Sequence, residues 1–141
     1  MKFATSTEKS VFNAPPMCHL FEYFDLKNPG EKHSVRYSGA SSNLLPVEWA
    51  GEVKVFPWKG FCTIEAIKKG EWQNRRPKLV KLPVNRGRSN GVYFLIRQGV
   101  YAIYIQGKSS GELYVLTQPS THYYKTMTGA SRMPVLVNQV I

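Results

Sequence analysis

Apolar and polar residues alternate most regularly between residues 92 and 118, where three stretches rich in Val, Ile, Leu and Tyr are separated by glycine-containing breaks. Short runs of β-branched and aromatic residues bounded by Gly and Ser are typical of β-strands. The pattern therefore predicts a three-stranded antiparallel meander within residues 91–118. Gln98-Gly99 supplies a two-residue turn after the first strand, and residues 107–111 form a longer loop after the second.

A second strand pattern lies nearer the N-terminus. The aromatic-rich stretch 20–27 leads into the turn signal Asn28-Pro29-Gly30, and residues 33–37 return as its partner. Aromatic enrichment favours a β-hairpin here. A short helix is the alternative, and its apolar positions at helical spacing are Met17, Leu20, Phe21 and Phe24.

The rest of the chain adds weaker strand signals. Residues 53–56 and 61–67 predict two further strands, and the apolar segment 133–140 predicts a last one. The segment 38–51 is rich in Gly, Ser and Asn and contains Pro46, so we expect a loop with at most one helical turn.

These elements predict a mainly β fold, all-β or α+β with little helix. Several strands are apolar on both faces, which indicates a small antiparallel barrel or a strongly curved sheet. A chain of 141 residues is long enough for one self-sufficient core. We expect a flexible N-terminal arm over residues 1–16 and a single domain over residues 17–141.

A hairpin turn at Gln98-Gly99 would set the register of the meander. It places Tyr93 opposite Tyr104, and pairing across the next loop places Tyr104 opposite Tyr114. These three tyrosines would form a row beside Arg97, an arrangement on which single-stranded nucleic acid stacks its bases. The alternative is that another layer of the protein covers this face, since aromatic residues favour strands in any case.

Positive charge is concentrated in the second half of the chain. The formal net charge is +10, yet residues 1–67 hold seven basic and seven acidic residues, whereas residues 68–141 hold twelve basic and two acidic. The densest part is the segment 68–88, where the only acid is Glu71, and we expect it to form a loop or ribbon rather than a helix. Its candidate phosphate contacts are Lys68, Lys69, Arg75, Arg76, Lys78, Lys81, Arg86 and Arg88, with Trp72 as a stacking residue.

Such a basic cluster among aromatic residues predicts a nucleic-acid-binding protein that is not an enzyme. RNA or single-stranded DNA is favoured over duplex, because no recognition helix is evident, and largely non-specific binding is expected. The alternative is a structural or inhibitory protein of a virus particle or nucleoprotein assembly, whose basic segment docks on an acidic protein or whose copies self-assemble. We expect a cytoplasmic, nuclear or virion protein without membrane contact, since neither a signal peptide nor a spanning segment is apparent.

Two short motifs suggest phosphate chemistry without the context it needs. The segment 102–109 fits the relaxed phosphate-loop pattern, but its variable positions are β-forming and a strand follows it instead of a helix. The segments 91–93 and 104–107 resemble the paired motifs of the GIY-YIG endonucleases. This sequence departs from that family by the inserted Gln106 and by its lack of later acids, since Glu112 is the only one after Glu71.

The cysteines and histidines form no recognisable set. Cys18 and Cys62 are far apart and are expected to be reduced thiols, with a disulfide as the alternative. Cys18 and His19 are adjacent, so on a strand they point to opposite faces. We therefore expect no catalytic residues, no metal site and no cofactor.

Overall fold

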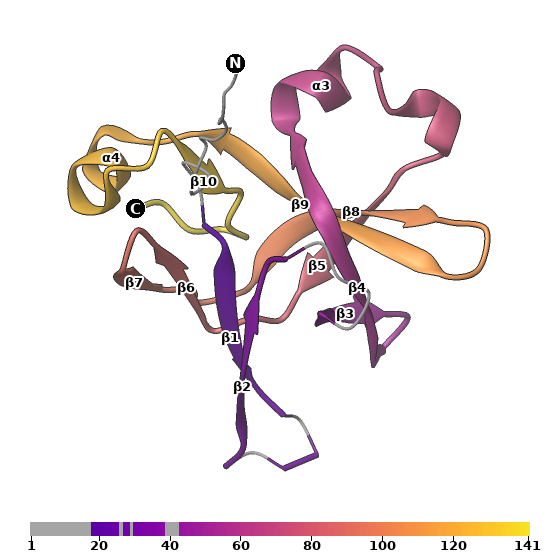
Figure 1. Cartoon of the computed structure of the whole chain (residues 1–141), viewed down its shortest axis with the longest axis horizontal. Helices are drawn as coiled ribbons and strands as arrows, with labels where there is room; N and C mark the ends of the chain where they lie inside the picture. The colour runs from indigo at the N-terminus through magenta and orange to yellow at the C-terminus, as the bar shows by residue number, and fades with distance from the viewer. Residues whose placement is uncertain (1–17, 26, 29, 39–42) are drawn as a thin grey trace, which may run out of the picture.

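The computed structural model describes residues 18–25, 27–28, 30–38 and 43–141 (Figure 1). The predicted arm over residues 1–16 lies outside the described residues. Most of the described chain is strand, and five strands close into a barrel, which confirms the predicted mainly β fold. A smaller four-stranded antiparallel sheet accompanies the barrel.

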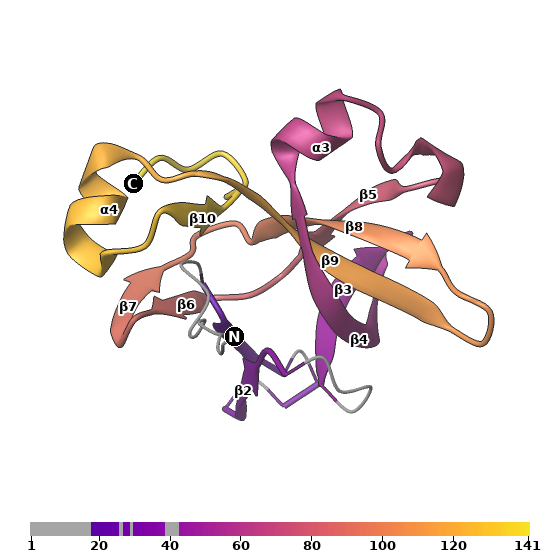
Figure 2. The same ribbon diagram turned by 45° about the horizontal axis from the view of Figure 1, so that its top comes forward.

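The barrel strands follow the order β3-β4-β9-β8-β5, and β5 returns to β3 to close the ring. β4 and β9 are parallel, whereas every other neighbouring pair in the ring is antiparallel. Figure 2 shows β8 and β9 running side by side, with the long β4 next to β9. β10 extends the sheet beyond β9. The bounds are β3 Leu44–Trp49, β4 Glu52–Thr63, β5 Lys78–Leu82, β8 Val100–Gln106, β9 Gly111–Pro119 and β10 Arg132–Pro134.

The second sheet has the order β2-β1-β6-β7. β1 and β2 form the hairpin expected from the aromatic pattern, and the helical alternative is wrong. β6 and β7 form another hairpin, whose turn residues Asn90 and Gly91 both have positive φ, at 48° and 81°. This backbone conformation is the one that a two-residue turn between twisted strands requires. The bounds are β1 Leu20–Phe24, β2 Lys32–Arg36, β6 Arg86–Ser89 and β7 Val92–Leu95.

One hydrophobic core joins the sheet to the barrel. Phe21 and Phe94 come from the sheet and Trp58 from the barrel, and none of these side chains is more than 6% exposed. The rings of Phe21 and Trp58 lie 5.2 Å apart, and Phe94 lies 5.2 Å from Tyr124. Burial of large aromatic rings is a major source of stability in small domains. The sheet therefore packs one face on the barrel and turns the other face outward.

In the described part of the chain, three short helical segments connect the strands. α3 (Ile64–Lys68) begins after Thr63, whose hydroxyl accepts a hydrogen bond from the Ala66 N–H at 3.0 Å. A 3₁₀ turn, η1 (Gln73–Arg75), follows it. α4 (His122–Thr128) ends at Gly129, which has a φ of 75°. In the part of the chain that the structure describes, no helix has the length and apolarity needed to cross a membrane.

An ion pair ties α3 to β10. The Arg132 guanidinium donates to both carboxylate oxygens of Glu65, at 2.8 and 2.9 Å. Hydrogen bonding from Arg132 lowers the pKa of Glu65 to about 2. The connector between α3 and β5 is therefore anchored at its start.

The predicted meander is only half correct. Its second and third strands pair as β8 and β9, but its first strand, β7, pairs with β6 and belongs to the other sheet. Gln98-Gly99 is therefore not a hairpin turn. The register also differs by one residue, because Tyr104 lies opposite Leu113 and Tyr114 lies opposite Ile103.

Two loop and strand boundaries also differ from the sequence prediction. The predicted loop over 38–51 contains β3, and the predicted strands over 53–56 and 61–67 are one strand, β4, followed by α3. Only Arg132–Pro134 of the C-terminal segment is a strand, with an isolated bridge between Leu136 and Val100 beyond it.

Candidate nucleic-acid interface

The fold divides the basic segment 68–88 among three places. Its first part lies on the connector from α3 through η1, its middle forms β5 of the barrel, and its last part forms β6 of the four-stranded sheet. The prediction of one continuous loop or ribbon is therefore wrong. The absence of a long helix in this segment is confirmed.

The connector folds back onto the outside of the barrel. Trp72 packs against Tyr114 with ring centroids 4.9 Å apart, and both belong to a second apolar cluster that includes Ile103 and Leu116. The guanidinium of Arg75 lies 4.9 Å from the Trp72 ring and 5.1 Å from the Tyr114 ring. These contacts stabilise the connector, and they engage the two predicted ligand contacts Trp72 and Arg75 within the protein.

The predicted tyrosine row does not form. Tyr93 lies on β7 in the four-stranded sheet, whereas the other two tyrosines lie on barrel strands. Tyr104 pairs with Leu113, the residue next to Tyr114, so Tyr104 and Tyr114 point to opposite faces of the barrel wall. Tyr104 packs into the main core and Tyr114 against the connector. Arg97 is exposed after β7, and its backbone N–H donates to the side chain of Gln139 at 2.8 Å.

Ion pairs separate the basic residues into two groups. Arg75 lies 3.6 Å from Glu112, and Arg86 lies 2.7 Å from Glu22. The other predicted phosphate contacts form no ion pair with any residue that the structure describes. They are Lys68, Lys69, Arg76, Lys78, Lys81 and Arg88.

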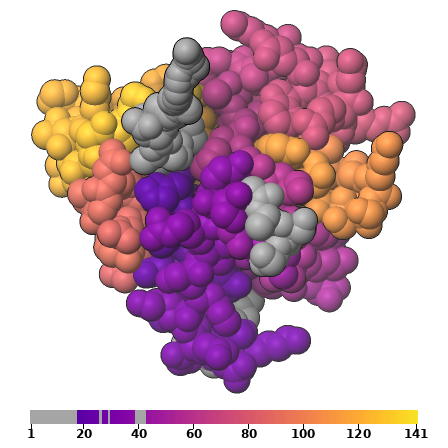
Figure 3. All heavy atoms as spheres, viewed as in Figure 1, coloured from indigo at the N-terminus to yellow at the C-terminus, as the bar shows by residue number. Residues whose placement is uncertain are grey.

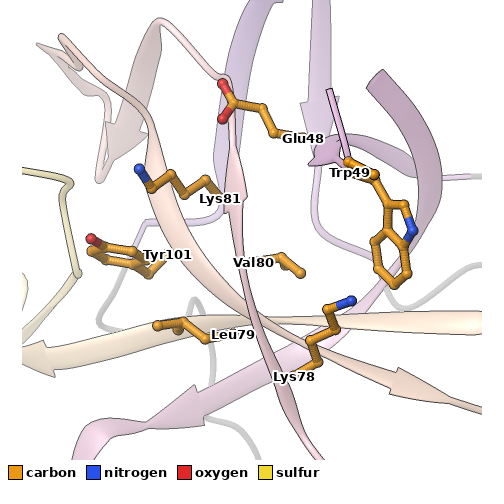
Figure 4. Close-up of a pocket in the computed structure, with 8 residues that line it drawn as sticks. Glu48, Trp49, Lys78, Leu79, Val80, Lys81 and Tyr101 are labelled. Carbon is orange, nitrogen blue, oxygen red and sulfur yellow. The ribbon is translucent and has the colours of Figure 1, made fainter. Parts of the chain in front are cut away.

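Two of the unpaired lysines line a groove on the barrel wall (Figure 4). The groove has a volume of about 600 Å³ and lies where β5 passes the end of β3. Lys78 extends toward Trp49, and its Nζ lies 4.1 Å from the centroid of the ring. Lys81 extends toward Tyr101, its register partner on β8. The remaining lining residues are Glu48, Ala50, Leu79 and Val80.

The groove exists because the seam between β3 and β5 is almost unpaired. A single residue pair, Glu48 with Lys81, joins these strands. Beyond it β3 turns away at Ala50-Gly51, two residues with positive φ, while β5 continues alone toward Lys78. Pro46 lies two residues before Glu48 on β3, so its backbone nitrogen faces β5 as that of Glu48 does. Proline has no N–H, and Pro46 therefore donates no hydrogen bond across the seam.

The aromatic wall of the groove is held from behind. Trp49 is half-buried and packs edge-on against Tyr104 at 4.8 Å, and its centroid lies 5.9 Å from that of Phe56. A second ammonium group, that of Lys54, lies 5.8 Å from the centroid of the Trp49 ring. The indole is thus held by aromatic contacts and has two ammonium groups near it. A fixed aromatic ring with cations nearby is a combination that binds a base and its phosphates.

The sequence analysis missed two of the groove residues. Trp49 lies in a segment that was predicted to be a loop, and Tyr101, which is partly buried, was not among the predicted ligand contacts. The sequence feature that could have placed Trp49 at the end of a strand is the turn Ala50-Gly51, which directly follows it.

The two cysteines are both free and buried. Burial raises the pKa of the Cys18 thiol to about 12 and that of Cys62 to about 11. Both thiols are therefore protonated at neutral pH, and thiolate is the reactive form of cysteine.

One cluster of potential metal ligands lies away from the groove, at the end of the β1–β2 hairpin. It consists of Asp25, Glu31 and His33, whose ligand atoms lie within 4.8 Å of one another. The His33 Nε2 is 3.4 Å from Asp25 and 3.8 Å from Glu31. The shorter of these contacts is a hydrogen bond between His33 and Asp25 that needs no metal ion. The expectation of no metal site stays a prediction.

Comparison with known proteins gives no relatives. The chain matches no known family, and neither a curated protein nor a solved structure is significantly similar to it.

Proposed function

We propose that this protein binds single-stranded nucleic acid, RNA or DNA, in the groove between β3 and β5, and that it does so without enzymatic activity. One observation carries the proposal: the rings of Trp49 and Tyr101 and the unpaired ammonium groups of Lys78 and Lys81 line one open groove of about 600 Å³. This volume lies within the range of small-ligand sites and suits one or two nucleotides.

The chemistry of the groove favours a single strand over a duplex. A base must leave its stack to contact the face of Trp49, and the Lys78 ammonium must move off the ring to bind a phosphate instead. Single strands present unstacked bases at little cost. Stacking on an aromatic side chain contributes about 1–3 kcal/mol per base. Lys78 and Lys81 would neutralise backbone phosphates and release counterions.

The same chemistry favours weak sequence dependence. An aromatic face accepts any base, and lysine ammonium groups bind phosphates that every nucleotide shares. Among the described residues that line the groove, Glu48 is the one carboxylate, and it is suited to accept a hydrogen bond from a base amino group.

A second candidate function is docking within a protein assembly. It is favoured by exposed apolar residues on the outer face of β3 and β4, where Leu44, Val53 and Val55 are 37–49% exposed. Register places them on one face of the hairpin. Exposed apolar patches of this kind mark protein contacts. Self-association that persists after nuclease treatment would favour this candidate.

Equilibrium binding of labelled 12-nucleotide strands tests the proposed function. We expect single-stranded oligonucleotides to bind at least about tenfold more tightly than the duplex of the same length in 50 mM salt, because only unpaired bases reach Trp49. Fluorescence anisotropy gives both affinities. Absence of binding to any strand, or stronger binding to duplex, would refute the proposal.

A further inference from the structure

The outward face of the four-stranded sheet, which is a different sheet from the one that bears the groove, gathers basic and aromatic side chains. Register places Arg86 and Arg88 of β6 beside Tyr93 and Leu95 of β7. In Figure 3 the indigo and purple atoms of the β1–β2 region lie beside the salmon atoms of the β6–β7 region.

This face is positively charged and partly apolar. Among the described strand residues whose register places them on this face, the basic ones are Lys32, Arg36, Arg86 and Arg88 and the one acid is Glu22, which leaves a net charge of +3. Three large side chains are exposed on it. Phe24 is 50% exposed, Tyr93 43% and Leu95 59%. The opposite face of the sheet packs on the barrel through Phe21 and Phe94.

A buried carboxylate organises the centre of the face. Glu22 is only 5% exposed and lies 2.7 Å from Arg86 and 3.7 Å from Lys32. Its burial opposes ionisation, but hydrogen bonding and charge from Arg86 outweigh this effect, and the pKa of Glu22 is lowered. Ser34 adds a hydrogen bond to the same carboxylate.

The arginines extend the aromatic surface of Tyr93. The guanidinium carbon of Arg86 lies 4.6 Å from the centroid of the Tyr93 ring, and that of Arg88 lies 5.3 Å from it. Guanidinium planes and aromatic rings are both surfaces on which unpaired bases stack. Arg88 forms no ion pair with a described residue, and its side chain is partly exposed.

We propose that this sheet face is a second binding surface for a single-stranded segment, so that one protein molecule holds two segments of the same nucleic acid. The inference rests on the proposed function of the groove and extends it from one site to two. The charge of +3 and the stacking surface around Tyr93 select a polyanion with bases as the occupant.

Two linked sites have a measurable signature. A short strand occupies either site alone, whereas a long strand reaches both, and its second contact is intramolecular. Linked binding of this kind raises affinity by about 10²–10⁴ at most, and by less when the linker is long or flexible. Affinity should therefore rise with strand length more steeply than the number of overlapping sites explains.

The experiment compares the double variant Y93S/R88Q with a control, Y123S/K125Q. Both remove one exposed tyrosine and one positive charge, but Tyr123 and Lys125 lie on α4, outside both surfaces. Affinity is measured for an 8-nucleotide and a 30-nucleotide strand. We expect Y93S/R88Q to leave the affinity of the 8-mer within about twofold and to weaken the 30-mer by about tenfold. The control should match the unaltered protein.

Other outcomes overturn the inference in distinguishable ways. Equal affinities of Y93S/R88Q and the unaltered protein at both lengths would show that the sheet does not bind, while leaving the groove proposal intact. Failure of the unaltered protein to bind either strand would refute the proposed function itself. Self-association that Y93S/R88Q abolishes, with no effect of strand length, would assign the face to a protein partner instead.

Discussion

Replacing both Lys78 and Lys81 with glutamine is expected to weaken the binding of a 12-nucleotide single strand by about tenfold or more in 50 mM salt. Both ammonium groups line the groove, and neither forms an ion pair with a described residue. The salt dependence should change as well. Each phosphate contact on a single strand contributes about 0.7 to the slope of log K against log salt, so the variant should lose about 1.4.

The control for this variant is K108Q/K125Q, which removes the same charge from exposed positions outside the groove. It should bind nearly as well as the unaltered protein, because neither lysine lines the groove. Both variants lower the net charge by two, so any general attraction to the polyanion falls by a similar amount in each. Equal losses in the two variants would mean that charge matters and the groove does not. Because Lys78 and Lys81 are exposed, unfolding curves of K78Q/K81Q should overlay those of the unaltered protein.

Replacing Gly99 with alanine is expected to lower the free energy of unfolding by about 2–4 kcal/mol. Gly99 has a φ of 94°, and a Cβ at this position would lie 2.3 Å from the carbonyl oxygen of Leu82. Neither a new rotamer nor a flexible side chain relieves a contact between a Cβ and a backbone oxygen. The backbone of β8 would have to separate from the end of β5, which opens the barrel beside the groove.

Gly51→Ala is the matched control for this prediction. Gly51 has a similar φ of 84°, but no atom lies within 4 Å of the position that a Cβ would occupy. The Gly51→Ala variant would have the backbone strain of a positive φ but no steric collision, and its free energy of unfolding should fall by about 1 kcal/mol. Urea unfolding of both variants measures the difference. Equal losses of stability would mean that the contact between Gly99 and Leu82 does not constrain the barrel.

The strands that the sequence predicts best are those whose partners follow them directly. The β1–β2 hairpin was predicted from aromatic enrichment and a nearby turn, and the β8–β9 pair from its apolar pattern and the loop between the two strands. The error at β7 came from competition between two turn signals. Asn90-Gly91 is the stronger hairpin signal, and in the structure it forms the β6–β7 turn.

The groove was not predictable because its walls come from strands far apart in the sequence. Lys81 and Tyr101 become neighbours only when β5 pairs with β8, and Trp49 joins them through the closure of the barrel. Periodicity reports which face of a strand is apolar, but it does not report which strand lies beside it. The positive charge of β5 could be predicted from the sequence, but the positions of Trp49 and Tyr101 beside this strand could not.

The predicted tyrosine row shows how sensitive such inferences are to register. A one-residue difference between β8 and β9 places Tyr104 in the main core and Tyr114 under the connector. Of the four residues proposed for that platform, Tyr93 alone lies on an exposed face with arginines around it. It contributes to the sheet surface instead.

Photo-crosslinking of a short single strand, followed by mass spectrometry, tests the central claim most directly. An 8-nucleotide strand carrying 5-iodouracil forms adducts with aromatic side chains that contact its bases. The account predicts adducts on Trp49 or Tyr101, and it predicts that K78Q/K81Q reduces their yield while K108Q/K125Q does not. A complex that forms with no adduct on either groove residue would contradict it.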